Sequence, residues 1–375
     1  MALIQYLTRI QFGYGALDTL ADELAALGIR RPLIVTDKGV AAAGLLAHVQ
    51  LKMGVEAADV FDETPANPTE KAALAAIHIY RHSKADGCIG LGGGSSMDLA
   101  KIVALGATHE GPLVRYAAIE GGAPKIGAHI APVVAIPTTA GTGSEVGRGA
   151  VLVFEDGRKL GVLSPHLIPR VAVCDPELTL GLPPLLTAAT GMDALAHCIE
   201  TFIAPAQNPP ADAIALDGAV RVASHIERAT KDGRDRDARW HMMSGAMQGA
   251  MAFQKGLGAV HALSHPLGGL KDVNPHHGTL NAVVMPAVLR FNESCCGEKY
   301  ARLRHALGLA EHAKLDRYVA ELNARLGLPS GLKAMGIGRE RFEAIVPQAL
   351  ADHTAATNPR RLDAGAVLHL LEESL

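Results

Sequence analysis

Residues 88–101 read CIGLGGGSSMDLAK, and this stretch decides the fold of the N-terminal half. A buried strand ending near Cys88–Gly90 runs into three glycines and then into a helical segment. Glycines let the backbone approach a ligand closely, and the free N–H groups at a helix start attract phosphate. We expect Ser95 to cap this helix with Asp98 as its capping-box partner. The pattern is neither GxGxxG nor a Walker sequence, so it fits either phosphate binding or a plain strand-to-helix turn.

Strand-like and helical segments alternate on both sides of this stretch. Short apolar runs that indicate buried strands are Pro32–Thr36, Val60–Phe61, Pro132–Ile136, Ala150–Phe154 and Val171–Cys174. Residues 16–27 and 69–82 carry apolar residues at helical spacing. This alternation predicts parallel βαβ units, with ligands at the carboxyl ends of the strands. EDGRK, at 155–159 between the last two of these runs, indicates a hairpin loop or an excursion from the sheet.

The sequence changes character after Asp175. From Pro176 onward we find no convincing strand, and prolines separate long helical segments up to the C-terminus. A chain of 375 residues also exceeds what one hydrophobic core usually serves. We therefore predict a boundary near residue 180, with an α/β domain at 1–180 and an all-helical domain at 181–375.

Composition and charge narrow the class of partner. The formal net charge is −3 with both signs interspersed, which gives no electrostatic footprint for nucleic acid or an anionic membrane. The first residues lack a basic region followed by a sustained apolar run, and no stretch of about 18 apolar residues occurs. The five cysteines are too few and too irregular for a disulfide framework. We expect a cytoplasmic protein that acts on a small molecule.

Two further segments of the first half could contact a nucleotide. PTTAGTGSE, at 137–145, offers Thr138, Thr139 and Thr142 between glycines, which fits a pyrophosphate or nicotinamide site or a polar turn. Asp37 follows the PLIVT strand. Its carboxylate could accept hydrogen bonds from a ribose and would repel a 2′-phosphate, which favours NAD over NADP; the alternative is a DKG turn.

Histidines and an aspartate in the second half are spaced as metal ligands. Asp193 and His197 in GMDALAHCIE lie four positions apart, so on a helix both side chains project from one face. His261 and His265 repeat this spacing, and His276–His277 follow. A carboxylate with three imidazoles suits Fe²⁺, Zn²⁺ or another divalent ion. A lone histidine is more often structural, and 17 histidines give some such pairs by chance, so spacing alone leaves the ligand set open.

The sequence motifs that contain these residues are more specific than their spacing. Through GGGSSMDLAK, PTTAGTGSE, GMDALAHCIE and HALSHPLGG followed by HHGTLNAVVMP, the chain resembles the iron-containing (group III) alcohol dehydrogenases. The motifs are ordered and run from about residue 30 to 290, which is nearly the whole chain. The resemblance implies the dehydroquinate synthase-like fold of this family, in which an α/β dinucleotide-binding domain precedes an all-α metal-binding domain. It also implies NAD(P), a divalent metal, and a homodimer or higher homo-oligomer.

The resemblance also assigns residues. Asp193, His197, His261 and His277 match the metal ligands; His277 precedes Gly278 in the family's HG-x-x-N pattern, so His276 is an extra neighbour. His265 falls where the family has a non-ligand histidine near the nicotinamide, and we expect it to relay a proton or to orient a ligand. The positions that match the cofactor contacts are Asp37, Asn67, Gly93, Gly94, Ser95, Thr138, Thr139, Thr142 and Lys159.

Within the family, the segments ATHEG at 107–111, IEGGA, DGRKLG, CDPELTLGLP, FIAPAQNPPAD and AMAFQKGLG resemble 4-hydroxybutyrate dehydrogenases. This implies NAD-dependent interconversion of 4-hydroxybutyrate and succinate semialdehyde. The substrate carboxylate then needs a cationic partner, for which Arg148 and Lys255 are the candidates. The alternatives are a lactaldehyde or 1,2-diol reductase, a lyase like dehydroquinate synthase, and a non-catalytic metal- or nucleotide-binding protein.

Overall fold

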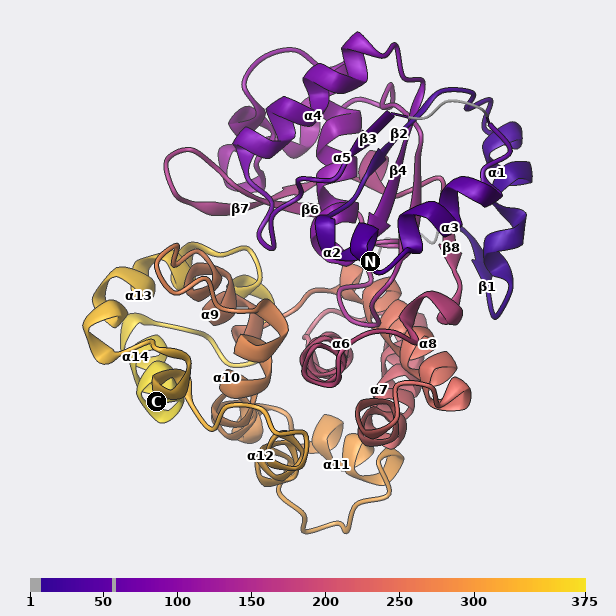
Figure 1. The fold of residues 1–375 in the computed structure, drawn as a ribbon. Coiled ribbons are helices and arrows are strands. Elements are labelled where there is room, and N and C mark those ends of the chain that lie inside the picture. The colour runs from indigo at the N-terminus through magenta and orange to yellow at the C-terminus, as the bar shows by residue number, and fades with distance from the viewer. Residues whose placement is uncertain (1–7, 56–58) are drawn as a thin grey trace. The chain divides into compact units, whose positions relative to one another are not determined.

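The computed structural model describes residues 8–55 and 59–375. Within them the chain forms two compact units, one ending at Leu182 and the other running from Pro183 to Leu375. Figure 1 shows both, and each is described by itself. No helix in the described residues is long and apolar enough to cross a membrane.

The first unit contains a six-stranded sheet in which every pairing is parallel. Its strand order is β1-β8-β5-β4-β2-β3 (Figure 1). The bounds are β1 Arg9–Phe12, β2 Pro32–Val35, β3 Asp59–Phe61, β4 Gly87–Gly92, β5 Val133–Pro137 and β8 Val171–Cys174. The predicted strands are confirmed, whereas β1 was not predicted because RIQF carries no apolar run.

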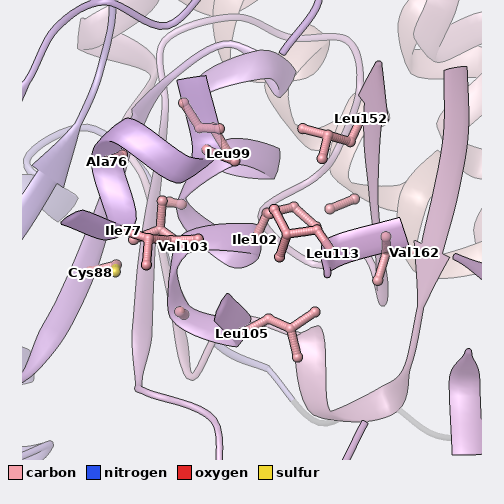
Figure 2. Packing of buried hydrophobic residues seen from close by; sticks show 14 of the residues in the cluster. Ala76, Ile77, Cys88, Leu99, Ile102, Val103, Leu105, Leu113, Leu152 and Val162 are labelled. Carbon is pink, nitrogen blue, oxygen red and sulfur yellow. The ribbon is translucent and has the colours of Figure 1, made fainter. Parts of the chain in front are cut away.

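Helices cover both faces of this sheet. Successive strand residues point to opposite sides, so apolar side chains on each face pack against a layer of helices. Ile34, Ile89 and Val134 pack with α1 (Leu20–Ala26), α2 (Lys38–Ala42) and α3 (Leu45–Lys52). Leu33, Cys88 and Val133, one residue earlier in each strand, pack with α4 (Glu70–His82) and α5 (Gly94–Thr108). Figure 2 shows the second cluster, which also includes Leu152 and Val162 from the segment between β5 and β8.

The excursion between β5 and β8 is an antiparallel hairpin. β6 (Gly149–Val153) pairs with β7 (Lys159–Leu163), and residues 154–158 connect them. The hairpin loop falls where it was predicted, but β7 was not predicted as a strand. Val153 N donates to Pro68 O at 2.8 Å, so the hairpin lies against the segment that follows β3.

The start of α5 differs from the prediction. The helix begins at Gly94 with Gly93 as its N-cap residue, and no side chain of the described residues caps it. The hydroxyl of Ser95 instead donates to Ala66 O, and the carboxylate of Asp98 accepts from Ser144 Oγ and Val151 N. The capping-box prediction was wrong because both side chains bind partners from distant parts of the chain instead of the backbone at the start of α5.

The second unit consists of helices, and its described residues contain no strand. The α-helices are α6 Pro184–Ile203, α7 Pro209–Lys231, α8 Arg236–Ala252, α9 Ala259–Gly268, α10 His277–Asn292, α11 Gly297–Ala306, α12 Leu315–Arg325, α13 Phe342–Ala351 and α14 Ala364–Glu373. Local signals start several of them. Pro184 is the first residue of α6, and the side chains of Asn208, Asp235 and Asp363 accept from backbone N–H groups in the first turns of α7, α8 and α14.

Helix α6 is the central element of this unit. It is buried from Thr187 to Ile203 and packs against α7, α8 and α10. The start of α10 comes so close to α6 that a Cβ at Gly278 would collide with the carbonyl oxygen of Ala189. Glycine is therefore required at this position, and the close approach brings the N-terminal end of α10 beside Asp193.

The packing under the sheet predicts a large loss of stability for Leu99→Ala. Leu99 of α5 is fully buried (Figure 2), so its truncation leaves a cavity and should lower the free energy of unfolding by about 2–5 kcal/mol. Leu74→Ala on α4 is the matched control, because Leu74 is 50% exposed and should cost only about 0.5 kcal/mol. Urea denaturation measures both; equal losses would contradict this description of the core.

Candidate functional site

Four of the predicted ligands meet in the helical unit. Asp193 and His197 lie one turn apart on α6, His261 lies on α9, and His277 is the first residue of α10. Asp193 Oδ1 is 3.9 Å from His197 Nε2 and 3.7 Å from the Nε2 atoms of both His261 and His277. These separations are too long for hydrogen bonds, but they fit donor atoms that share an ion bonded at about 2.0–2.2 Å.

Helix α9 is held beside α6 by side chains far away in the sequence. Its N-cap residue is Gly258, and no side-chain cap comes from its own loop. Instead, Asn358 Oδ1 accepts from Ala259 N at 3.1 Å and Glu200 Oε1 accepts from Val260 N at 2.6 Å. These two bonds satisfy the first N–H groups of α9 and fix the position of His261 one residue later.

Glu200 also binds His261 directly and was missed by the sequence analysis. Its Oε2 lies 2.6 Å from His261 Nδ1, and both side chains are buried. Since a carboxylate only accepts, Nδ1 carries the proton and Nε2 presents its lone pair toward Asp193. A signal was present: Glu200 follows His197 by three positions and Asp193 by seven, so it shares their face of α6.

Asn281 marks the point on which the ligand atoms converge. Its Nδ2 lies 2.6 Å from Asp193 Oδ1, 3.2 Å from His261 Nε2 and 3.3 Å from His277 Nε2. The amide oxygen of Asn281 is buried without a hydrogen-bond partner among the described residues. The lone pairs of the ligand atoms therefore face one electropositive N–H group, and the amide oxygen beside them has no partner. A cation site has these features, so the residues fit a divalent metal.

The electrostatics of the cluster agree with this reading. Burial alone would raise the pKa of the Asp193 carboxyl, but the neighbouring His197, His261 and His277 hold this pKa well below its usual range. Burial lowers the pKa of an imidazole, yet the carboxylates of Asp193 and Glu200 beside His261 raise its pKa to about 9. Surroundings that favour a proton so strongly also favour a cation, which must displace that proton when it binds.

His265 lies next to the ligand set without being part of it. Its Nδ1 is 2.8 Å from Asp352 Oδ2, so Nδ1–H donates to this carboxylate and Nε2 is left to accept a proton. The His265 ring is stacked 5.6 Å from that of His277 and 6.0 Å from that of His353. Burial opposes ionisation of Asp352, but His265 holds its pKa well below the usual range. No sequence pattern indicated Asp352, which lies 87 residues beyond His265.

The structure contradicts the predicted substrate contact of Lys255 and distinguishes His276 from His277. Lys255 is not a free cation: its buried ammonium donates to Thr201 O and Phe202 O at 3.0 Å and to Asp212 Oδ1 at 2.5 Å. It satisfies the end of α6, and nothing is left to bind a substrate carboxylate. His276 is exposed at the N-cap position of α10, so of the two adjacent histidines only His277 faces Asp193.

A second group with metal-ligand chemistry lies between α7 and α8 and comprises His225, Asp237 and His241. Arg221 Nη1 lies 3.0 Å from His241 Nδ1, and Arg228 Nη1 is 3.0 Å from Asp237 Oδ2. Because a guanidinium only donates, His241 must accept at Nδ1 and, when neutral, carries its proton on Nε2, the atom that faces Asp237. Two guanidinium groups and a protonated ligand atom disfavour a cation here.

The predicted nucleotide contacts gather in the other unit, at the carboxyl ends of the parallel strands. Asp37 follows β2, Gly93 follows β4, and Thr138 follows β5. Thr138 N donates to Gly92 O at 3.0 Å, and Lys159 Nζ donates to Asn67 Oδ1 at 2.8 Å. This is the edge at which open α/β sheets bind ligands.

The glycines here allow the threonine loop, residues 138–148, to lie directly on the start of α5. A Cβ at Gly94 would collide with the Thr142 side chain, and one at Gly93 would lie 3.5 Å from Thr139. Asp37 Oδ1 accepts from Gly39 N and Val40 N and so caps α2, while its other oxygen lies 3.4 Å from Ser96 Oγ. The α5 N-terminus, left without a side-chain cap among the described residues, is a suitable phosphate site.

Comparison with protein families matches both units. Residues 8–176 match the model of the iron-containing alcohol dehydrogenases, and residues 187–375 match that of the C-terminal region of the Fe-containing alcohol dehydrogenase family. Together these two segments span nearly the whole chain.

Individual relatives agree. The chain is 57% identical over 383 aligned residues to 4-hydroxybutyrate dehydrogenase of Cupriavidus necator, with both chains fully covered. The structure of a 1,3-propanediol oxidoreductase superposes with a TM-score of 0.93 at 32% identity and covers all of both chains. That of sulfoacetaldehyde reductase from Bifidobacterium kashiwanohense in complex with NAD⁺ gives 0.89 at 26% identity over 100% and 99% of the two chains. The chain therefore belongs to the iron-containing alcohol dehydrogenase family of oxidoreductases.

Proposed function

We propose that this protein is an NAD-dependent, divalent-metal-activated dehydrogenase that interconverts 4-hydroxybutyrate and succinate semialdehyde, with Fe²⁺ as its metal. The observation that carries the proposal is that the Nε2 atoms of His197, His261 and His277 all lie within 3.9 Å of Asp193 Oδ1. The substrate rests on the 57% identity to a 4-hydroxybutyrate dehydrogenase along the full chain. NAD is supported by family membership and by the NAD⁺ complex of a structural relative.

The metal would be held by the Asp193 carboxylate and the Nε2 atoms of the three histidines. When bound, it supplies a Lewis acid for the alcohol oxygen, and NAD⁺ supplies the acceptor for the hydride. Glu200 keeps His261 in the tautomer that offers Nε2, and Asn281 lies against the same ligand atoms. The four residues and Glu200 therefore form one polar cluster, which is buried except for part of the His277 side chain.

Oxidation of the alcohol releases one hydride and one proton. We assign the proton to His265, whose Nδ1–H is bound to Asp352 and whose Nε2 can accept it. The His353 ring, stacked against that of His265, is 40% exposed in its side chain and leads toward solvent. In the reverse direction the same imidazole returns the proton as the aldehyde is reduced.

The nucleotide would lie along the carboxyl ends of β2, β4 and β5. The uncapped start of α5 would bind the pyrophosphate, with Gly93, Gly94 and Ser95 close to it. Hydroxyls of the threonine loop and the Asn67–Lys159 pair would contact the same dinucleotide. Asp37 would face the ribose, where its negative charge disfavours the 2′-phosphate of NADP.

The substrate proposal predicts the outcome of an activity screen. Protein purified without oxygen and loaded with Fe²⁺ should reduce NAD⁺ faster with 4-hydroxybutyrate than with 1,2-propanediol, 1,3-propanediol or butan-1-ol, judged by kcat/KM from NADH absorbance. A preference for the diols would favour the diol reductase alternative. The structural similarity to a 1,3-propanediol oxidoreductase supports that alternative. No net NADH with any alcohol would contradict the proposed function.

The Glu200 contact predicts a change in metal affinity. A glutamine has one acceptor oxygen for the two N–H groups of Val260 and His261 that Glu200 now accepts, so Glu200→Gln should weaken Co²⁺ or Zn²⁺ binding by about 10–100-fold. Chelator competition measures this affinity independently of catalysis. The control is Asp363→Asn, which removes a carboxylate from the same unit but keeps a good helix cap. Equal metal affinities in the two variants would refute the role of Glu200.

The exposed Arg148 remains the candidate for the substrate carboxylate once Lys255 is set aside. Because a charge-assisted hydrogen bond contributes about 1.5–3 kcal/mol, Arg148→Ala should raise KM for 4-hydroxybutyrate by about tenfold or more and leave KM for butan-1-ol nearly unchanged. Arg170→Ala, another exposed arginine of the same unit, is the control and should change neither constant. Similar effects of Arg148→Ala on both substrates would remove Arg148 from the site.

A further inference from the structure

A buried charged group lies beneath the threonine loop and has no part in the chemistry above. Lys101, two turns into α5, is fully buried. Its ammonium donates to Ser144 Oγ at 2.8 Å, to Gly147 O at 3.0 Å and to Gly149 O at 2.8 Å. All three acceptors belong to the threonine loop or to the first residue of β6, so one side chain fastens this segment to α5.

Asp98 completes the arrangement from the preceding turn of α5. Its Oδ1 accepts from Ser144 Oγ at 2.5 Å, and its Oδ2 accepts from Val151 N at 2.8 Å. Ser144 therefore lies between the two charges, accepting from Lys101 and donating to Asp98. Three acceptors around Lys101 Nζ match the three N–H bonds of an ammonium. Burial lowers the pKa of Lys101 to about 8, and the Asp98 and Glu145 carboxylates oppose this change.

The threonine loop needs such an attachment. It contains three glycines, which cost more conformational entropy to order than other residues, and it has no helix or strand of its own. Much of it is nevertheless buried, so its carbonyl groups require partners. Without Lys101, the carbonyls of Gly147 and Gly149 and the hydroxyl of Ser144 would each lose a donor.

The same helix provides both the attachment and the proposed phosphate site. Lys101 and Asp98 hold the loop from the first turns of α5, whose N-terminal Gly94 touches Thr142 of that loop. We propose that Lys101, Asp98 and Ser144 are positioning residues for the nucleotide, which lock the threonine loop onto the start of α5 before the dinucleotide binds. This inference rests on the proposed function, because it takes the nucleotide site to lie at this turn. A preformed site loses less entropy when its ligand binds.

The test is NADH affinity, measured by fluorescence titration of the full-length, metal-loaded protein. Lys101→Met and Ser144→Ala should each raise the dissociation constant for NADH by about tenfold or more, since each removes buried hydrogen bonds that attach the threonine loop to α5. Both should raise KM for NAD⁺ much more than they lower kcat at saturating NAD⁺. Their Co²⁺ affinity should stay at the wild-type value, because the ligand set lies in the other unit.

Two controls separate positioning from general destabilisation. Arg239→Met removes an equally buried cation from the helical unit, and Thr108→Ala removes a hydroxyl from the far end of α5. Neither should change NADH affinity, even where the melting temperature falls. If Lys101→Met does not fold, the milder Ser144→Ala decides.

The possible failures are distinguishable. Wild-type affinity for NADH in Ser144→Ala, or a loss no greater than in the two controls, would overturn the positioning role and leave the proposed function intact. Failure of the metal-loaded wild-type protein to bind NADH would overturn the proposed function and this inference together.

Discussion

The proposed chemistry of this protein depends on one buried carboxylate oxygen, Asp193 Oδ1, toward which three imidazoles from three helices point. Like-directed lone pairs in a buried site repel one another and carry excess negative charge, so the arrangement is stable only with a cation or a bound proton at its centre. The helices must therefore oppose that repulsion. They do so where Gly278 lets α10 touch α6, and where Glu200 and Asn358 fix the first turn of α9.

Both units use buried polar side chains to place loops and helix ends that apolar packing alone would leave undefined. Glu200 accepts from the backbone of α9 and from His261 with the two oxygens of one carboxylate. Lys101 donates to the backbone and to a side chain of the threonine loop with one ammonium. In each case a charged group several turns inside a helix determines where a distant segment lies. Such groups are costly to bury, and complete hydrogen bonding offsets that cost.

Much of the fold followed from local pattern. The strand, glycine and helix order of 88–101 predicted a parallel sheet with a ligand edge, and the i,i+4 spacing placed Asp193 and His197 on one helix face. Helix geometry could also have indicated Glu200, which lies on that same face. The family's HG-x-x-N motif, rather than the spacing of the histidines, distinguished His277 from the adjacent His276.

The predictions that failed concern tertiary partners. Ser95 and Asp98 have the spacing of a local capping box, but in the folded chain their side chains bind Ala66 O and Ser144 Oγ instead. Lys255 lies six residues before a ligand, which suggested a substrate contact, yet the end of α6 and Asp212 satisfy its ammonium completely. Asp352 lies far from His265 in sequence, and no periodicity links them. Only the folded chain reveals such pairings, because each depends on which helices become neighbours.

The account can be tested most directly by anomalous X-ray diffraction at the iron edge from crystals of protein loaded anaerobically with Fe²⁺. It predicts one ion per chain, bonded to a carboxylate oxygen of Asp193 and to nitrogens of His197, His261 and His277. An iron peak at the His225, Asp237 and His241 group instead, or none beside Asp193, would contradict the central claim.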